Sequence, residues 1–323
     1  MVIFDLAAAS GDLTALQPRQ FIGIPIALVG AVFLSLGAQL QHRGVTKVER
    51  HTEHDGRGGL QLKQLTLLLA RPSWVLGTVM LGLAIVLQLT SLAFSPLIVV
   101  QPLGAVSLVI TAIINARVSG NRLNKRTILA ICLCVGGVGA FVIVAAFAAR
   151  EVPVTESDLV EILIVLGIVL VLCGVAFGVF RSRLPAIGYV VGAGVLYGFV
   201  ATLAKSVISR IEQQEFDVLT LFCVLALLAA VGLGAYFVQN AYASGPPDLV
   251  IAGLTVIDPL IAVTIGIAIL NEAAGAQLWQ MLAFLLCGAI AIVGVFLLAR
   301  VHPGVRTYDD AVEPENPHRA GSA

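Results

Sequence analysis

The chain has 323 residues, of which 59% are hydrophobic and only 12% charged, and its 19 Lys and Arg residues balance 19 Asp and Glu residues. Soluble domains carry about 25% charged residues, so this composition cannot supply the polar surface of a soluble enzyme. The zero formal net charge excludes a strongly basic nucleic-acid binder and an acidic disordered protein, and the cysteine count excludes a disulfide scaffold. The remaining class is an all-α polytopic membrane protein.

Hydropathy predicts nine membrane-spanning helices. A spanning helix needs roughly 20 consecutive apolar residues. The stretch 72–116 is too long for one helix, and we divide it at Ser95-Pro96 because proline suits the first position of a helix. The predicted spans are about 20–41, 73–93, 97–117, 127–148, 161–180, 185–208, 219–242, 248–270 and 277–299.

The basic residues predict the orientation of these spans. Nine crossings place the two termini on opposite sides, and cytoplasmic loops carry an excess of Lys and Arg. One side receives only Arg19, Arg150 and Arg210. The other receives fifteen basic residues: Arg43, Lys47, Arg50, Arg57, Lys63, Arg71, Arg117, Arg122, Lys125, Arg126, Arg181, Arg183, Arg300, Arg306 and Arg319. We therefore expect a multi-pass plasma-membrane protein with its N-terminus outside and its C-terminus in the cytoplasm.

The chain also predicts an internal repeat with a shift of 150 residues. Pro96 corresponds to Pro246 and Asn121 to Asn271 without a gap. Five crossings separate the starts of the two units, so the second unit has inverted topology, which is typical of secondary transporters with a midplane substrate site.

The predicted organisation therefore has five parts: an extracellular segment 1–19, a first four-helix repeat 20–149 with a cytoplasmic loop 42–72, a linking helix 150–183, a second four-helix repeat 184–299, and a disordered cytoplasmic tail 300–323. Within the loop, His51, His54 and Asp55 resemble a weak metal cluster, but the glycines that follow favour a solvated flexible loop.

Three segments carry a resemblance to a known family. Residues 95–105 (SPLIVVQPLGA), the corner 121–124 (NRLN) and the pair Asn271-Glu272 resemble the drug/metabolite transporter superfamily (EamA-like), and most closely its NIPA-type magnesium transporter branch. The resemblance implies nine spans and a transport function. The first corner departs from the family pattern, because Asn121 stands where an acidic residue is usual and only Glu272 keeps the acid.

Asp258 is the main candidate for a pathway residue and for a metal ligand. It lies near the centre of the predicted eighth span, where a carboxylate costs about 2.5–3.5 kcal/mol on insertion scales. Pro259 follows, cannot donate to the carbonyl of Thr255, and predicts a kink. A carboxylate beside a freed carbonyl is how broken transporter helices coordinate ions. The alternative is a protonated or structurally paired aspartate.

Lys205 is the one basic residue in the interior of a predicted span. It is predicted either to pair with Asp258 or hold an anionic substrate, or to extend to the outer interface. Gln101-Pro102 in the first half loosely resembles Asp258-Pro259 in the second. Other uncharged polar residues that could line the pathway or bridge helices are Gln88, Asn115, Gln239 and Asn240.

Together these features predict a secondary transporter or facilitator that moves a cation, with Mg²⁺ as one candidate, or a small solute by alternating access. A proton-coupled small-molecule exporter and a non-transporting membrane scaffold are the alternatives. No nucleotide-binding or hydrolase motif occurs, so we predict neither an enzyme nor a cofactor. The expected partners are the lipid bilayer and the transported cation or solute, with no nucleic acid, and a homodimer is left open.

Overall fold

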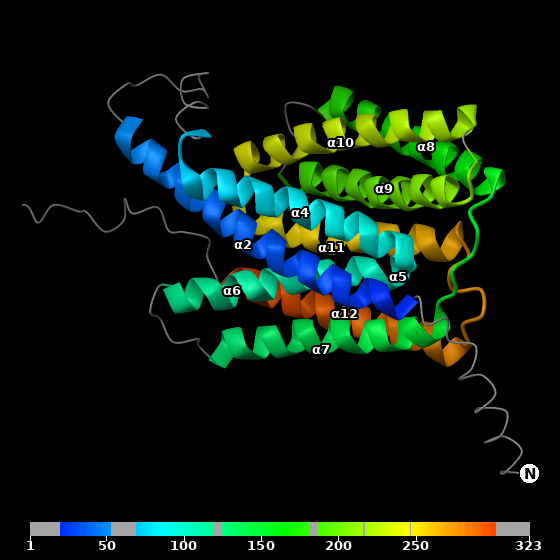
Figure 1. Cartoon of the computed structure of the whole chain (residues 1–323), viewed down its shortest axis with the longest axis horizontal. Helices are drawn as coiled ribbons and strands as arrows, with labels where there is room; N and C mark the ends of the chain where they lie inside the picture. Colours follow the sequence, from blue (N-terminus) through cyan, green and yellow to red (C-terminus); the bar gives the residue numbers. More distant parts are fainter. Residues whose placement is uncertain are drawn as a thin grey trace, which may run out of the picture.

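The computed structural model describes residues 20–52, 69–118, 125–180, 186–215, 217–245 and 247–301. All the regular elements in these ranges are helices (Figure 1). They are α2 (Gln20–Thr52), α4 (Pro72–Phe94), α5 (Leu97–Val100), the 3₁₀ helix η2 (Gln101–Ala105), α6 (Val106–Val118), α7 (Lys125–Ala148), α8 (Glu156–Phe180), α9 (Ala186–Glu212), α10 (Val218–Ser244), α11 (Pro247–Ala268) and α12 (Leu278–Val301).

Nine segments within these ranges are long and apolar enough to cross a membrane, as the sequence predicts. Two boundaries differ from the prediction. Helix α2 continues to Thr52, so residues 42–52 are helical and not part of a loop. Helix α8 begins at Glu156 and not near 161, because Thr155 and Asp158 cap each other's backbone N–H groups and start the helix earlier.

The third span is the irregular one. It consists of α5, η2 and α6 in succession, and Pro96 precedes the first helical residue and does not occupy that position. Pro102 has no N–H to donate, which favours the 3₁₀ segment over a continuous α-helix at this point. By contrast, α11 runs through Pro259 as one helix.

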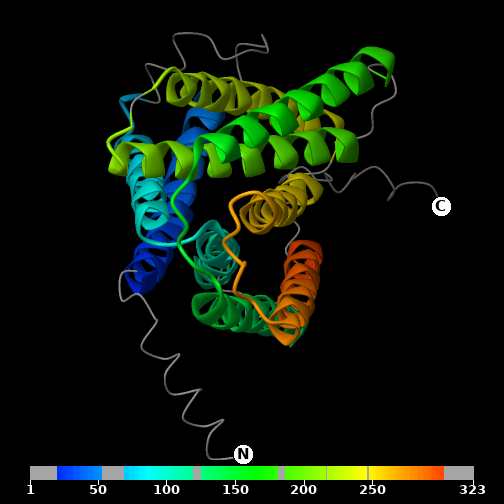
Figure 2. The same ribbon diagram turned by 90° about the vertical axis from the view of Figure 1, so that its right-hand side faces the viewer.

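Four helix pairs make up most of the packing: α2 with α4, α7 with α12, α9 with α10, and α9 with α11. In the end view α11 lies beside α9, with α7 and α12 beyond it, and α8 lies against α9 and α10 at the periphery (Figure 2). Glycine permits the closest approach between α7 and α12. A Cβ on Gly294 would lie 2.4 Å from the backbone nitrogen of Cys134.

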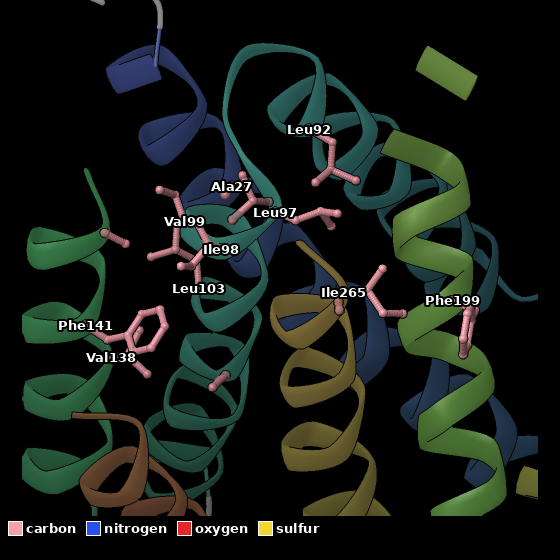
Figure 3. Packing of buried hydrophobic residues seen from close by; sticks show 14 of the residues in the cluster. Ala27, Leu92, Leu97, Ile98, Val99, Leu103, Val138, Phe141, Phe199 and Ile265 are labelled. Carbon is pink, nitrogen blue, oxygen red and sulfur yellow. The ribbon is translucent and has the colours of Figure 1, made fainter. Parts of the chain in front are cut away.

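The core is centred on the broken third span. Leu97, Ile98 and Val99 are buried, and they lie between α7 on one side and α11 and α9 on the other (Figure 3). The helix break therefore lies inside the protein and not at its lipid-facing surface. Its backbone polar groups must consequently find partners within the chain.

The repeat, the orientation and the division into five parts stay predictions. Four predicted parts lie outside the described residues: the segment 1–19, residues 302–323 of the tail 300–323, the middle of the 42–72 loop with His54 and Asp55, and the corner at Asn121.

Candidate functional site

The break between α4 and α5 leaves backbone groups without helical partners on both of its sides. The last turn of α4 leaves carbonyl oxygens free, and the first turn of α5 leaves N–H groups free. Both helix ends are buried within the protein, so other groups of the chain must satisfy them. Two charged side chains from the second half of the chain do so, Glu272 and Lys205.

Glu272 caps the start of α5. Its carboxylate oxygens accept the backbone N–H groups of Leu97 at 2.8 Å and Ile98 at 2.9 Å. The local chain geometry delivers this carboxylate: Asn271 adopts a left-handed conformation (φ 54°), and the N–H of Glu272 returns to the carbonyl of Gly266 at 3.0 Å. This bond closes a loop of seven residues around Asn271, and asparagine tolerates the left-handed conformation better than most residues.

Lys205 binds the other side of the same break. Its ammonium donates to the carbonyls of Leu92 (2.7 Å) and Ser95 (3.3 Å) and forms an ion pair with Glu151 (2.7 Å). The side chain is buried on α9, so it does not extend to the interface. Glu151 belongs to the segment between α7 and α8, so Lys205 joins three parts of the chain: α9, the end of α4 and this segment.

The predicted pairing of Lys205 with Asp258 is therefore wrong. Gly194 of α9 lies against Ile257 of α11, and Gly198 lies against Ile261, so the two helices run in parallel. Lys205 lies seven residues after Gly198, and Asp258 lies three residues before Ile261. At 1.5 Å per residue, the two charges are separated by roughly 15 Å along the helices.

The electrostatics of Glu272 reflect its burial. It is 3% exposed, and this burial raises the pKa of its carboxyl above the ordinary value. The backbone N–H groups of Ile98 and Leu97 oppose this rise, as does the ammonium of Lys205, whereas the carboxylate of Glu151 adds to it. Glu272, Lys205 and Glu151 thus form one interacting group of charges, which we call the outer cluster.

Asp258 has a different environment. It is partly buried on α11, and its Oδ1 atom is buried without a hydrogen-bond partner among the residues that the structure describes. Tyr197 of α9 is close enough to interact electrostatically with it. A buried carboxylate oxygen without a partner costs free energy unless a proton, a water molecule or an ion satisfies it.

Pro102 and Pro259, two of the predicted pathway residues, line one cavity between η2, α7, α11 and α12. The remaining lining residues are almost all apolar: Ala105, Val138, Phe141, Thr255, Val256, Leu260, Val263, Gly288, Ala291, Ile292 and Val295. Asp258 and Gln101 do not line it, so the structure does not bring these two together with the prolines at one cavity.

The other predicted polar residues are dispersed. Gln101 is buried, Gln88 and Asn240 are partly buried, and Gln239 is exposed on α10. The side chain of Asn115 lies outside the described part of the chain. Within the described ranges, no three His, Cys, Asp or Glu residues gather into a metal-binding group.

Glu151 is the functional candidate that sequence reasoning missed. It follows Arg150 directly after the predicted fourth span, in a short loop whose charges resemble ordinary solvated loop residues. No local signal distinguishes it, because its partner Lys205 is 54 residues away in the chain.

Comparison with known proteins gives one family. The family model described as "Magnesium transporter NIPA" matches residues 19–184, half of the chain. An uncharacterized protein of Corynebacterium glutamicum is 26% identical over 86% of this chain and 95% of its own length. Two Arabidopsis thaliana proteins named probable magnesium transporters, NIPA4 and NIPA5, are 30% and 26% identical over 36% and 44% of this chain. These alignments cover only about a third of each plant protein. No solved structure matches.

Proposed function

Because the chain belongs to the NIPA magnesium transporter family, we propose that it carries Mg²⁺ across the membrane through a midplane site at Asp258. The family match and the nine apolar helices support a membrane cation transporter. We propose in addition the site at Asp258, Mg²⁺ as the transported ion and alternating access as the mechanism.

The observation that carries the proposal is that the Oδ1 atom of Asp258, within an apolar span, has no hydrogen-bond partner among the described residues. Pro259 leaves the carbonyl of Thr255 without its usual helical donor. Residues 255 and 258 lie on neighbouring positions of one helix face, so both oxygens are available to a cation. Mg²⁺ keeps most of its water ligands and needs only one or two carboxylates, so a single aspartate is compatible with it.

The outer cluster supports alternating access. Glu272 and Lys205 come from the second half of the chain, and both bind the helix break of the first half. In the proposed mechanism these contacts hold the halves together at the end predicted to face outward. Transport then requires that they separate, because a carrier must open each end in turn.

A second candidate is the export of a small apolar solute. The apolar walls of the cavity between η2, α7, α11 and α12 favour it, because ligand sites for organic molecules are predominantly lined by apolar side chains. In that case Asp258 serves as a proton carrier and not as a metal ligand.

The test uses the purified full chain in liposomes that contain a Mg²⁺-sensitive dye. We expect Mg²⁺ flux in the wild type and a decrease to about a tenth or less in Asp258→Asn, since a neutral amide loses the charge that attracts a desolvating cation. Gln239→Leu is the matched control, because this polar side chain is also intramembrane but exposed on α10.

The outcomes separate the candidates. Mg²⁺ flux that Asp258→Asn leaves intact contradicts the proposed site. Absent Mg²⁺ flux with proton-dependent solute flux favours the exporter, and absence of both fluxes in a folded protein favours a membrane scaffold.

A further inference from the structure

The ammonium group of Lys205 lies among three oxygen atoms. Two backbone carbonyl oxygens, from Leu92 and Ser95, and the Oε1 atom of Glu151 lie 2.7–3.3 Å from Nζ. Lys205 is only 6% exposed, so these oxygens hold a cation away from solvent. Backbone carbonyls combined with a carboxylate are the ligands that hard divalent cations take in proteins.

The charges of the outer cluster do not balance. Glu151 and Glu272 contribute two carboxylates, and both interact electrostatically with Lys205 or with each other. Lys205 neutralises one of these charges. A divalent cation in the place of the ammonium would neutralise both, and buried charges are stable only when they are compensated.

We infer that these oxygens form a second cation site, separate from Asp258, that Lys205 occupies in this state and from which a divalent cation displaces it. The site does not rest on the acidic residues alone, because a cation is already seated among the carbonyls. The inference rests on the proposed function only for the identity of the cation.

Displacement has a structural consequence. The carbonyls that bind Lys205 come from the last turn of α4 (Leu92) and from Ser95, which follows α4 at the break that leads to α5. When Lys205 leaves, α9 loses its polar connection to the end of α4. A cation that arrives at this end therefore releases one of the two contacts between the halves.

A neighbouring cluster provides an internal comparison. Arg210 is also buried on α9 and pairs with Glu215 and Asp217. The side chains of these acids are 52% and 35% exposed, against 22% for Glu151. Arg210 thus carries the same type of charge on the same helix, but its ligands are solvated carboxylates. We assign no cation site to it.

The first arm of the test uses the unaltered protein in detergent. Lysine amines are reductively methylated with formaldehyde and a borohydride reagent, with MgCl₂ or with choline chloride of equal ionic strength. Mass spectrometry then compares Lys205 with the exposed Lys125. We expect Mg²⁺ to raise the modification of Lys205 several-fold and to leave Lys125 unchanged. Equal modification of Lys205 in both salts overturns the inference.

The second arm measures Mn²⁺ binding by electron paramagnetic resonance, since Mn²⁺ prefers similar oxygen ligands. Lys205→Met removes the competing ammonium. We expect about tenfold tighter Mn²⁺ binding than in the wild type, as for a site that is free only a tenth of the time. The added Glu151→Gln should abolish this gain, and Arg210→Met should not produce it.

All these variants are repeated with Asp258→Asn, which separates the two proposals. Tighter binding in Lys205→Met that persists without Asp258 supports the outer site even if Mg²⁺ flux is absent. No gain in a folded Lys205→Met, or a gain that Glu151→Gln does not affect, overturns the inference. If Lys205→Met does not fold, the methylation result decides.

Discussion

The carboxylate of Glu272 accepts the backbone N–H of Leu97 at 2.8 Å, although 175 residues separate them in the chain. This bond connects the corner after α11 with the first residue of α5. A carboxylate at a helix start satisfies N–H groups that have no partner within the helix, and it interacts favourably with the positive end of the helix dipole. A buried acid that would otherwise be costly thereby becomes a structural connection between the two halves.

Replacement of Glu272 by alanine should destabilise the protein by about 2–4 kcal/mol, because it leaves the N–H groups of Leu97 and Ile98 buried without partners. The measurement is thermal unfolding in detergent, followed by size-exclusion chromatography. Glu156→Ala, an exposed acid in the first turn of α8, should change stability by less than about 0.5 kcal/mol. Equal effects of the two variants would show that the cap contributes nothing.

The pH dependence of stability should identify Glu272 by its sign. Burial raises the pKa of its carboxyl in the folded protein, whereas the unfolded value is about 4.3. The folded state binds this proton more tightly, so the associated stability is fully present below about pH 4.3 and is lost as the pH rises through the raised pKa. The unfolding temperature of the wild type should therefore fall across this range relative to Glu272→Gln. Parallel curves of unfolding temperature against pH for the wild type and Glu272→Gln would contradict this prediction.

Asp217 should behave with the opposite sign. The hydroxyl and backbone N–H of Thr220 donate to its carboxylate at the start of α10 and lower its pKa, and Arg210 adds to this effect. The stability that it contributes is present above its unfolded pKa of about 3.9 and is lost as the pH falls through the lowered value. The advantage of the wild type over Asp217→Asn should thus shrink on acidification, which a series of unfolding curves would measure.

The absence of a side chain at Gly266 leaves room for the carboxylate of Glu272. A Cβ at this position would lie 2.9 Å from Oε2 of Glu272. We expect Gly266→Ala to displace the carboxylate from α5 and to cost about 1–3 kcal/mol, as overpacking does. Gly136→Ala in α7 is the control, because nothing lies within 4 Å of its added Cβ. That variant should be neutral or slightly stabilising, since alanine is the better helix former. Equal changes in the unfolding temperature of Gly266→Ala and Gly136→Ala would refute the steric argument.

Hydropathy was sufficient to predict the nine spans, because a span depends on the composition of about 20 consecutive residues and on little else. The division at Pro96 was also predictable, since proline acts on its own turn. The length of α2 was not: its polar residues 42–52 resemble a loop in composition, yet they continue the helix.

Composition and hydropathy were enough to predict a polytopic membrane protein with nine spans and with the intramembrane charges Asp258 and Lys205. The groups that those charges contact follow from the packing of distant helices. Lys205 binds Glu151 across 54 residues and the end of α4 across more than a hundred, and its predicted partner Asp258 lies two to three turns away. The physical reason is that apolarity is a local property, whereas the partner of a buried charge depends on where distant helices pack against each other.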